Sequence, residues 1–159
     1  MATENLSFAA QVSEWAKEEI DRAEAVFHTA AQTVANDVRT SVSEGGRMPV
    51  KTGNLRRSLM ASTSDMPRIQ EGKTTFSDSG VEIIIAGAEL GSTVYLGFQA
   101  AYAARMNYGF VGTDSLGRAY NQTGYGFVDA VSQRWPAIVA AAEATVRGRF
   151  EAGPAPQSG

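Results

Sequence analysis

A long stretch near the N-terminus constrains the fold more than any other feature of the chain. Residues 5–44 contain no proline or glycine, and small or apolar side chains recur at steps of three and four residues. This spacing predicts one amphipathic helix, which Gly45 and Gly46 would end. At about 1.5 Å per residue this helix would be roughly 57 Å long. A compact domain of this chain length is only about 30 Å across, so we expect part of the helix to project and to pack on something else.

Shorter elements are expected after the basic loop of residues 45–53. Thr52 or Asn54 would cap a short helix that begins near Leu55, because their side-chain oxygens can accept bonds from free amide groups. The buried side of this helix would consist of Leu55, Leu59 and Met60. The β-branched run at residues 81–86 predicts a strand, paired through a turn at residues 88–92 with a second strand at residues 93–98. A weaker strand is expected within residues 61–65 or 69–76.

The second half of the chain predicts helices around a glycine-rich connection. A short helix is expected over residues 100–107, followed by a flexible, exposed loop over residues 109–126. A last helix covers residues 128–150, and Pro136 should kink or restart it. Residues 151–159 are expected to be a disordered tail. Together these elements predict one α+β domain over residues 1–150, with short helices and the C-terminal helix packed on a small antiparallel sheet.

Composition excludes several kinds of chemistry. The 159 residues include no cysteine and a single histidine, His28, so disulfides, thiol catalysis and common zinc sites are disfavoured. No phosphate loop, nucleophile elbow or calcium loop is present, and no pair of carboxylates stands out as acid and base. We therefore predict a protein that is not an enzyme and that needs no cofactor. No apolar run approaches the length of about 20 residues that a membrane span requires, and no secretion signal is visible. We expect synthesis in the cytosol.

Charge is segregated along the chain although the net charge is only −3. Residues 1–44 carry eight acidic and three basic side chains, whereas residues 45–73 carry six basic and two acidic ones. An overall acidic chain disfavours a dedicated nucleic-acid binder. The segregation instead suits contacts between an acidic face of one molecule and a basic face of another.

Three groups of side chains are candidates for an interface. The basic group could be a solvated loop, a contact with the acidic face of another copy, or a contact with phosphate. The aromatic group could be core and loop anchors or a protein interface, where tyrosine and phenylalanine are enriched. The candidates are Arg47, Lys51, Arg56 and Arg57 in the basic group; Glu14, Glu18 and Asp21 on the long helix; and Tyr108, Phe110, Tyr120 and Tyr125 among the aromatic residues.

Three segments resemble a phage protein family. Residues 48–59, Met-Pro-Val-Lys-Thr-Gly-Asn-Leu-Arg-Arg-Ser-Leu, are similar to a pattern P-V-x-T-G-x-L-R-x-S that follows a long N-terminal helix. Residues 102–109 resemble a Y-A … G segment, and residues 126–130 resemble the P-F-L-x-x-A start of the last helix. The family is the neck and tail-completion proteins of long-tailed bacteriophages. Two positions depart from its pattern: Asn107 replaces a frequent acidic residue, and Gly126 replaces the proline.

The resemblance implies a structural virion protein that forms a ring, commonly of six copies, at the head–tail junction. Its expected neighbours are head-completion and tail-tube or tail-terminator proteins, and DNA would pass through the ring without sequence-specific contact. It would be located in the virion, and in the host cytoplasm during assembly. Neck, tail-terminator and tail-completion roles are not separated by the sequence. The alternative is a small nucleic-acid-binding or adaptor protein without catalytic activity.

Overall fold

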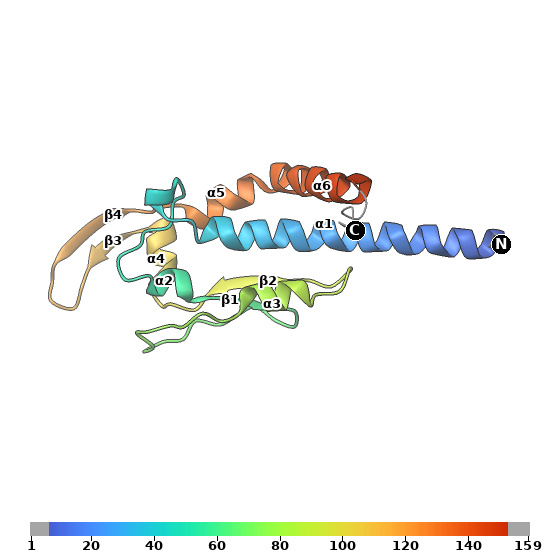
Figure 1. Ribbon diagram of the computed structural model, residues 1–159. Helices are drawn as coiled ribbons and strands as arrows, with labels where there is room; N and C mark the ends of the chain where they lie inside the picture. The colour runs from blue at the N-terminus through green and yellow to red at the C-terminus, as the bar shows by residue number, and fades with distance from the viewer. Residues whose placement is uncertain (1–6, 153–159) are drawn as a thin grey trace, which may run out of the picture.

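The computed structural model describes residues 7–152, so the expected helix start at residue 5 and the tail beyond residue 152 lie outside the described residues. The predicted α+β class is confirmed. Helix α1 (Phe8–Val38) is the longest helix, and its N-terminal part extends past every other labelled element (Figure 1). The other elements are η1 (Val42–Glu44), α2 (Asn54–Arg57), β1 (Leu59–Ser62), α3 (Val81–Ala86), β2 (Tyr95–Phe98), α4 (Ala103–Tyr108), β3 (Gly109–Thr113), β4 (Ala119–Thr123), α5 (Phe127–Gln133) and α6 (Trp135–Ala152).

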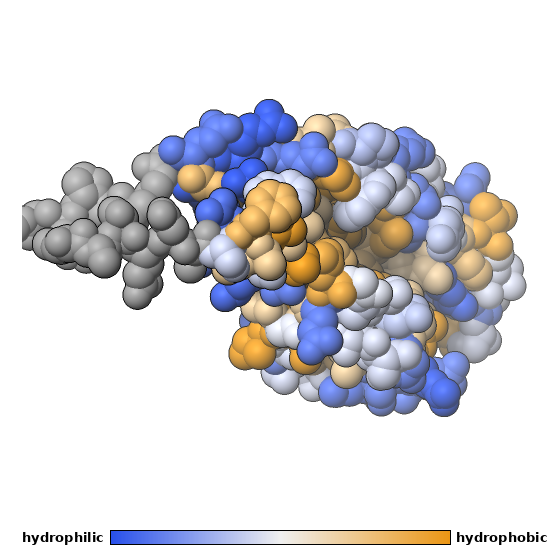
Figure 2. Space-filling view, turned by 90° about the vertical axis from the view of Figure 1, so that its right-hand side faces the viewer, coloured by the Kyte–Doolittle hydropathy of each residue, from blue (hydrophilic) through white to orange (hydrophobic). Residues whose placement is uncertain are grey.

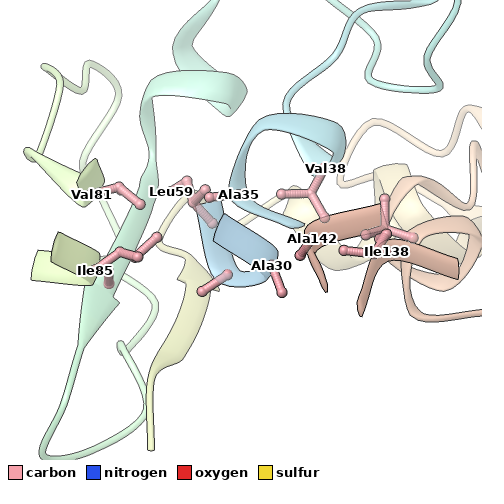
Figure 3. Packing of buried hydrophobic residues seen from close by; sticks show 11 residues of the cluster. Ala30, Ala35, Val38, Leu59, Val81, Ile85, Ile138 and Ala142 are labelled. Carbon is pink, nitrogen blue, oxygen red and sulfur yellow. The ribbon is translucent and has the colours of Figure 1, made fainter. Parts of the chain in front are cut away.

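The main core surrounds the C-terminal half of α1. Figure 3 shows α1 between two layers, with α3 and β1 on one side and α6 on the other. Ala30 and Ala35 on α1 are 2% and 0% exposed, and such small side chains let the neighbouring elements approach closely. Val81 and Ile85 of α3 fill one layer, and Ile138 on α6 fills the other. The C-terminal helix therefore packs on α1 where we had expected the sheet.

Helix α1 ends earlier than the sequence pattern predicts. Its last residue is Val38, and the glycine pair ends only the short η1 turn, where Gly45 has φ +91°. Polar side chains satisfy the last carbonyl groups of α1, since Arg39 Nε donates to Ala35 O and Thr40 Oγ1 donates to Asn36 O. A new capping box then begins at Ser41, whose hydroxyl donates to Glu44 over 2.6 Å. Local hydrogen bonding thus breaks a helix that periodicity alone would continue.

The strand predicted over residues 81–86 is wrong, because this segment is helix α3. Val81 and Ile85, four residues apart, are 0% and 1% exposed, whereas Ile83 between them is 77% exposed. A strand would place all three on one face, so tertiary packing has selected the helical spacing over β propensity. The second predicted strand exists as β2, but its antiparallel partner is β1, with Leu59 opposite Phe98. Part of the weaker strand expected at residues 61–65 is therefore present in β1.

The short helix near Leu55 is present as α2, but its cap differs from the prediction. The N-cap residue is Gly53, with φ +80°, and the hydroxyl of Thr52, one of the two predicted residues, accepts from the Asn54 amide over 3.4 Å. Leu55 and Leu59 are buried as expected, whereas Met60 is 37% exposed and lies on β1.

The loop predicted over residues 109–126 is an ordered hairpin. Strands β3 and β4 pair antiparallel from Gly109 opposite Thr123 to Thr113 opposite Ala119. The hairpin extends away from the body at the end opposite the N-terminus (Figure 1). Its residues are mostly exposed, as predicted, because no other element covers them. Glycine suits two of its positions: Gly109 has φ +91°, and a Cβ at Gly124 would overlap the backbone of Asn107 and Tyr108.

The expected last helix is divided into two. Helix α5 ends at Gln133, and α6 begins at Trp135, so Pro136 lies in the first turn of α6. Proline is tolerated there because the first amide groups of a helix have no intrahelical acceptor. The predicted restart at Pro136 is confirmed.

Candidate interaction surfaces

The first candidate surface is the projecting segment, which we define as residues 8–21 of α1. Its side chains are exposed apart from half-buried Ala10 and Ala16. Helix α6 ends beside it, where the Arg22 guanidinium lies 5.1 Å from the centre of the Phe150 ring. Glu14, Glu18 and Asp21 are all exposed here, as the interface prediction requires.

The second surface is the basic end, which comprises residues 47–57 at the opposite end of the molecule (Figure 1). Arg47 and Lys51 are exposed in the loop before α2. Arg56 lies 3.6 Å from Glu44 of η1. Hydrogen bonds from the Ser41 hydroxyl and backbone N–H, together with the nearby Arg56, hold the pKa of Glu44 below its ordinary value. Arg56 therefore already has a carboxylate partner within its own chain.

Arg57 differs from the other cations of the basic end, because its guanidinium is turned toward its own chain. Its Nε donates to the Phe76 carbonyl over 2.9 Å, and its terminal nitrogen donates to Asn54 Oδ1 over 2.9 Å and to the Thr52 carbonyl over 3.3 Å. Arg57 nevertheless remains exposed, so these bonds orient its side chain without burying it. Its bonds hold the loop before α2 against the segment that contains Phe76.

A groove of about 560 Å³ opens at the basic end. It lies between the loop that precedes α2 and helix α4, and most of its lining surface is apolar. We call it the groove and define it by Val42, Val50, Lys51, Tyr102, Met106 and Tyr125. The structure thus brings together two predicted interface residues, Lys51 and Tyr125, that are far apart in the sequence.

The remaining aromatic candidates lie on or beside the β3–β4 hairpin. Tyr108, at the end of α4, is 72% exposed. Phe110 and Tyr120 lie on opposite strands with ring centres 6.3 Å apart, and the Arg105 guanidinium lies 4.4 Å from the Phe110 ring centre. The predicted interface residues therefore fall into three places: the projecting segment, the basic end with its groove, and the hairpin.

A second buried cluster supports the groove from beneath. It contains Met48, Leu55, Ala103 and Phe127, with Phe76 and Ala100, and each is at most 9% exposed. Met48 and Leu55 come from the first of the three segments that resemble the phage family. Ala103 comes from the second segment and Phe127 from the third. Residues separated by up to 79 positions in the chain are thus packed into one unit.

Asn107 joins the second and third segments by hydrogen bonds. It is 5% exposed, its Oδ1 accepts from the Val128 amide over 3.0 Å, and its Nδ2 donates to Asp129 Oδ2 over 3.1 Å. The side chain thereby satisfies a free amide group in the first turn of α5. This neutral amide offers both a donor and an acceptor, which an ionised acidic residue at the same position would not.

Among residues 7–152, no cluster of three potential metal-binding side chains occurs. No helix in the same range has the length and apolar character needed to cross a bilayer. His28 is half-buried, and its Nε2 lies 2.6 Å from the Ala88 carbonyl oxygen.

Sequence reasoning missed one feature, the apolar lining of the groove, because Val42, Val50 and Tyr102 belong to separate elements and only the fold brings them together. The exposure of Phe8, Val12, Trp15 and Ile20 agrees with the expectation that part of the long helix projects from the domain.

Comparison with known proteins adds no relative from which a role could be transferred: no protein-family model, curated protein or solved structure matches the chain.

Proposed function

We propose that the protein is a structural virion protein that forms a ring at the head–tail junction of a long-tailed phage. In this role it joins tail to head and lines the channel through which DNA passes. Its neighbours would be further copies of itself, a head-completion protein, and a tail-tube or tail-terminator protein. It acts by binding and not by catalysis.

One observation carries the proposal. The three segments that resemble the neck and tail-completion family form one buried unit, in which Leu55, Ala103 and Phe127 are packed together. A chance resemblance of three short segments would have no reason to coincide with a single packed cluster. The long N-terminal helix that precedes the first segment in this family also has a counterpart in α1.

The distribution of charge supports ring formation. The projecting segment holds four carboxylates and one lysine, and the basic end at the other extreme of the molecule holds four cations. Contacts between unlike ends are heterologous, and heterologous contacts generate rings when the rotation closes. The alternative, a DNA-binding adaptor, has less support because the chain is acidic overall, with a net charge of −3.

The experiment is a joining assay on particles that lack this protein. We expect such particles to accumulate as separate full heads and tails, and purified protein to restore infectious, joined particles. The control is an equal amount of protein carrying Ile138→Ala, which removes a buried side chain of the core. Normal joining without the protein would refute the proposed function.

A DNA-binding measurement separates the alternative. The ring proposal predicts weak binding to duplex DNA with little sequence preference. A tight complex whose affinity falls steeply with salt would favour the adaptor instead.

A further inference from the structure

The projecting segment carries an apolar stripe that no described part of the chain covers. Phe8, Val12, Trp15 and Ile20 are 82%, 45%, 63% and 55% exposed. At 100° per residue these four side chains fall on one side of the helix, and Glu14, Glu18 and Asp21 fall outside it, with Glu18 nearest to Trp15. Glu19 lies within the stripe, where it contacts Arg22 over 3.6 Å. Figure 2 looks at the molecule from this end and shows hydrophobic residues gathered in the foreground beside hydrophilic ones. A contiguous exposed patch of this kind indicates a binding surface.

The groove at the opposite end has the complementary character. Its walls include Val42, Val50, Tyr102 and Tyr125, which are 55%, 45%, 42% and 38% exposed. A volume of about 560 Å³ gives room for large apolar side chains. The groove is also surrounded by positive charge, because Lys51 lines it and Arg47 is exposed in the same loop.

We propose that the apolar stripe of one copy binds in the groove of a second copy, with Trp15 as its anchor. The carboxylates nearest to Trp15, Glu18 at the edge of the stripe and Glu19 within it, then face the cations beside the groove. Tryptophan in a pocket is a frequent dominant contact in protein interfaces, and charged pairs at the rim set orientation. The projecting segment of each copy binds one neighbour, and its groove binds the projecting segment of another, so the contact is head-to-tail.

Two other arrangements fit the observations less well. Pairing of two projecting segments would bring together two surfaces that each hold four carboxylates and one lysine, and like charges repel. A second apolar pocket, of about 400 Å³, lies between α1, β2 and α5 and includes Leu96 and Trp135. The adjacent cation, Arg134, is already bound to Asp37 over 3.0 Å, so this pocket lacks the free positive charge that the acidic segment would meet.

The inference deepens the proposed function, because it specifies the contact from which the ring is built. The inference depends on the proposed function only for where the ring lies in the particle. Self-association through the stripe and the groove can be measured with the purified full chain alone.

The first test uses a pair of variants. Trp15→Ala disables the stripe and leaves the groove, whereas Val50→Asp disables the groove and leaves the stripe. We expect sedimentation to show each variant alone as a monomer and an equimolar mixture as a one-to-one dimer. Trp15→Ala should weaken self-association roughly thirty-fold. Both side chains are exposed, so the circular dichroism of each variant should match that of the parent.

The second test places the partners by cross-linking. The chain has no cysteine, so Val12→Cys in one variant and Thr52→Cys in another give single thiols in a clean background. We expect a disulfide between the two variants when they are mixed and oxidised, and much less between copies of either one. Ser64→Cys, an exposed position away from the groove, replaces Thr52→Cys as the matched control.

Specific outcomes overturn the inference. A strictly monomeric parent protein, a Val12→Cys homodimer as the main product, or unchanged assembly of Val50→Asp would each exclude the stripe-to-groove contact. If Trp15→Ala protein still forms rings and still joins tails to heads, this contact is refuted and the proposed function stands. If the parent protein assembles through the groove but fails to join tails to heads, the contact stands and the proposed function is refuted.

Discussion

The two halves of α1 have the same amphipathic pattern but different surroundings. In the half that ends at Val38, the buried positions are mostly alanine, and α3, β1 and α6 enclose the helix. In the projecting segment, the large apolar side chains of Phe8 and Trp15 are exposed, and no described element covers them. Large apolar side chains gain most from burial, so this difference supports the proposed contact with a second copy.

The largest difference between the halves should appear in hydrogen exchange. In dilute, monomeric protein, amides of residues 30–38 should exchange roughly a thousandfold more slowly than amides of residues 8–18. The packed half opens only with the core, whereas a short helical end without tertiary contacts frays. Mass spectrometry of exchanging peptides measures both. Equal protection of the two sets of amides in the monomer would contradict the comparison. Added protection of residues 8–18 at high protein concentration would indicate that self-association covers the projecting segment.

The next largest expected effect is on the free energy of unfolding, and it compares two valines of the same helix. Val38 is 6% exposed and Val12 is 45% exposed. Val38→Ala should lower the free energy of unfolding by about 2–3 kcal/mol, since it removes buried methyl groups and leaves a cavity. Val12→Ala should change it by less than about 0.5 kcal/mol. Urea titration of the monomers measures both values, and a comparable loss in the two variants would mean that the projecting segment is part of the folded core.

Arg39, at the end of the packed half, should contribute less to the free energy of unfolding than the buried Val38. Arg39 donates from Nε to the Ala35 carbonyl over 2.9 Å and from a terminal nitrogen to Glu82 over 2.7 Å. Its side chain is only 16% exposed, so Arg39→Ala should cost about 1–2 kcal/mol. Lys17, exposed on the projecting segment, is the control, and Lys17→Ala should leave thermal unfolding unchanged. An equal loss of stability in Lys17→Ala would mean that Lys17 makes stabilising contacts that the structure does not contain.

The smallest expected effect is the pH dependence of the Arg39–Glu82 pair. The hydrogen bond from Arg39 holds the pKa of Glu82 below its ordinary value of 4.5. A carboxyl whose folded pKa is lowered stabilises the fold fully above pH 4.5, and that stabilisation is lost as the pH falls through the folded value. Glu82 is half-exposed, so the effect is about 0–1 kcal/mol. Glu82→Gln should reduce the acid sensitivity of unfolding between pH 5 and pH 3 by about this amount, and urea titration of the variant and the parent at both pH values measures it.

The sequence by itself determined the elements whose signal is local and long. The period of α1, the restart near Pro136 and the burial of Leu55 and Leu59 follow from spacing and backbone chemistry, and the structure contains all of them. The excess length of α1 over a compact domain also follows from residue count alone. The acidic and basic candidate residues could also be named without a structure, because the charge of a side chain follows from its residue type.

Tertiary structure decided everything that depends on which segments meet. Residues 81–86 have β-branched side chains, yet they form a helix because Val81 and Ile85 must both face α1 and β1. Residues 109–126 read as a loop, yet they form a hairpin because their glycines allow a tight approach of two backbones. The hydrogen bond from Arg57 to the carbonyl of Phe76, nineteen residues away, likewise depends on which segments meet. The groove belongs to the same class, because Val42, Lys51, Tyr102 and Tyr125 become neighbours only when distant segments share one buried cluster.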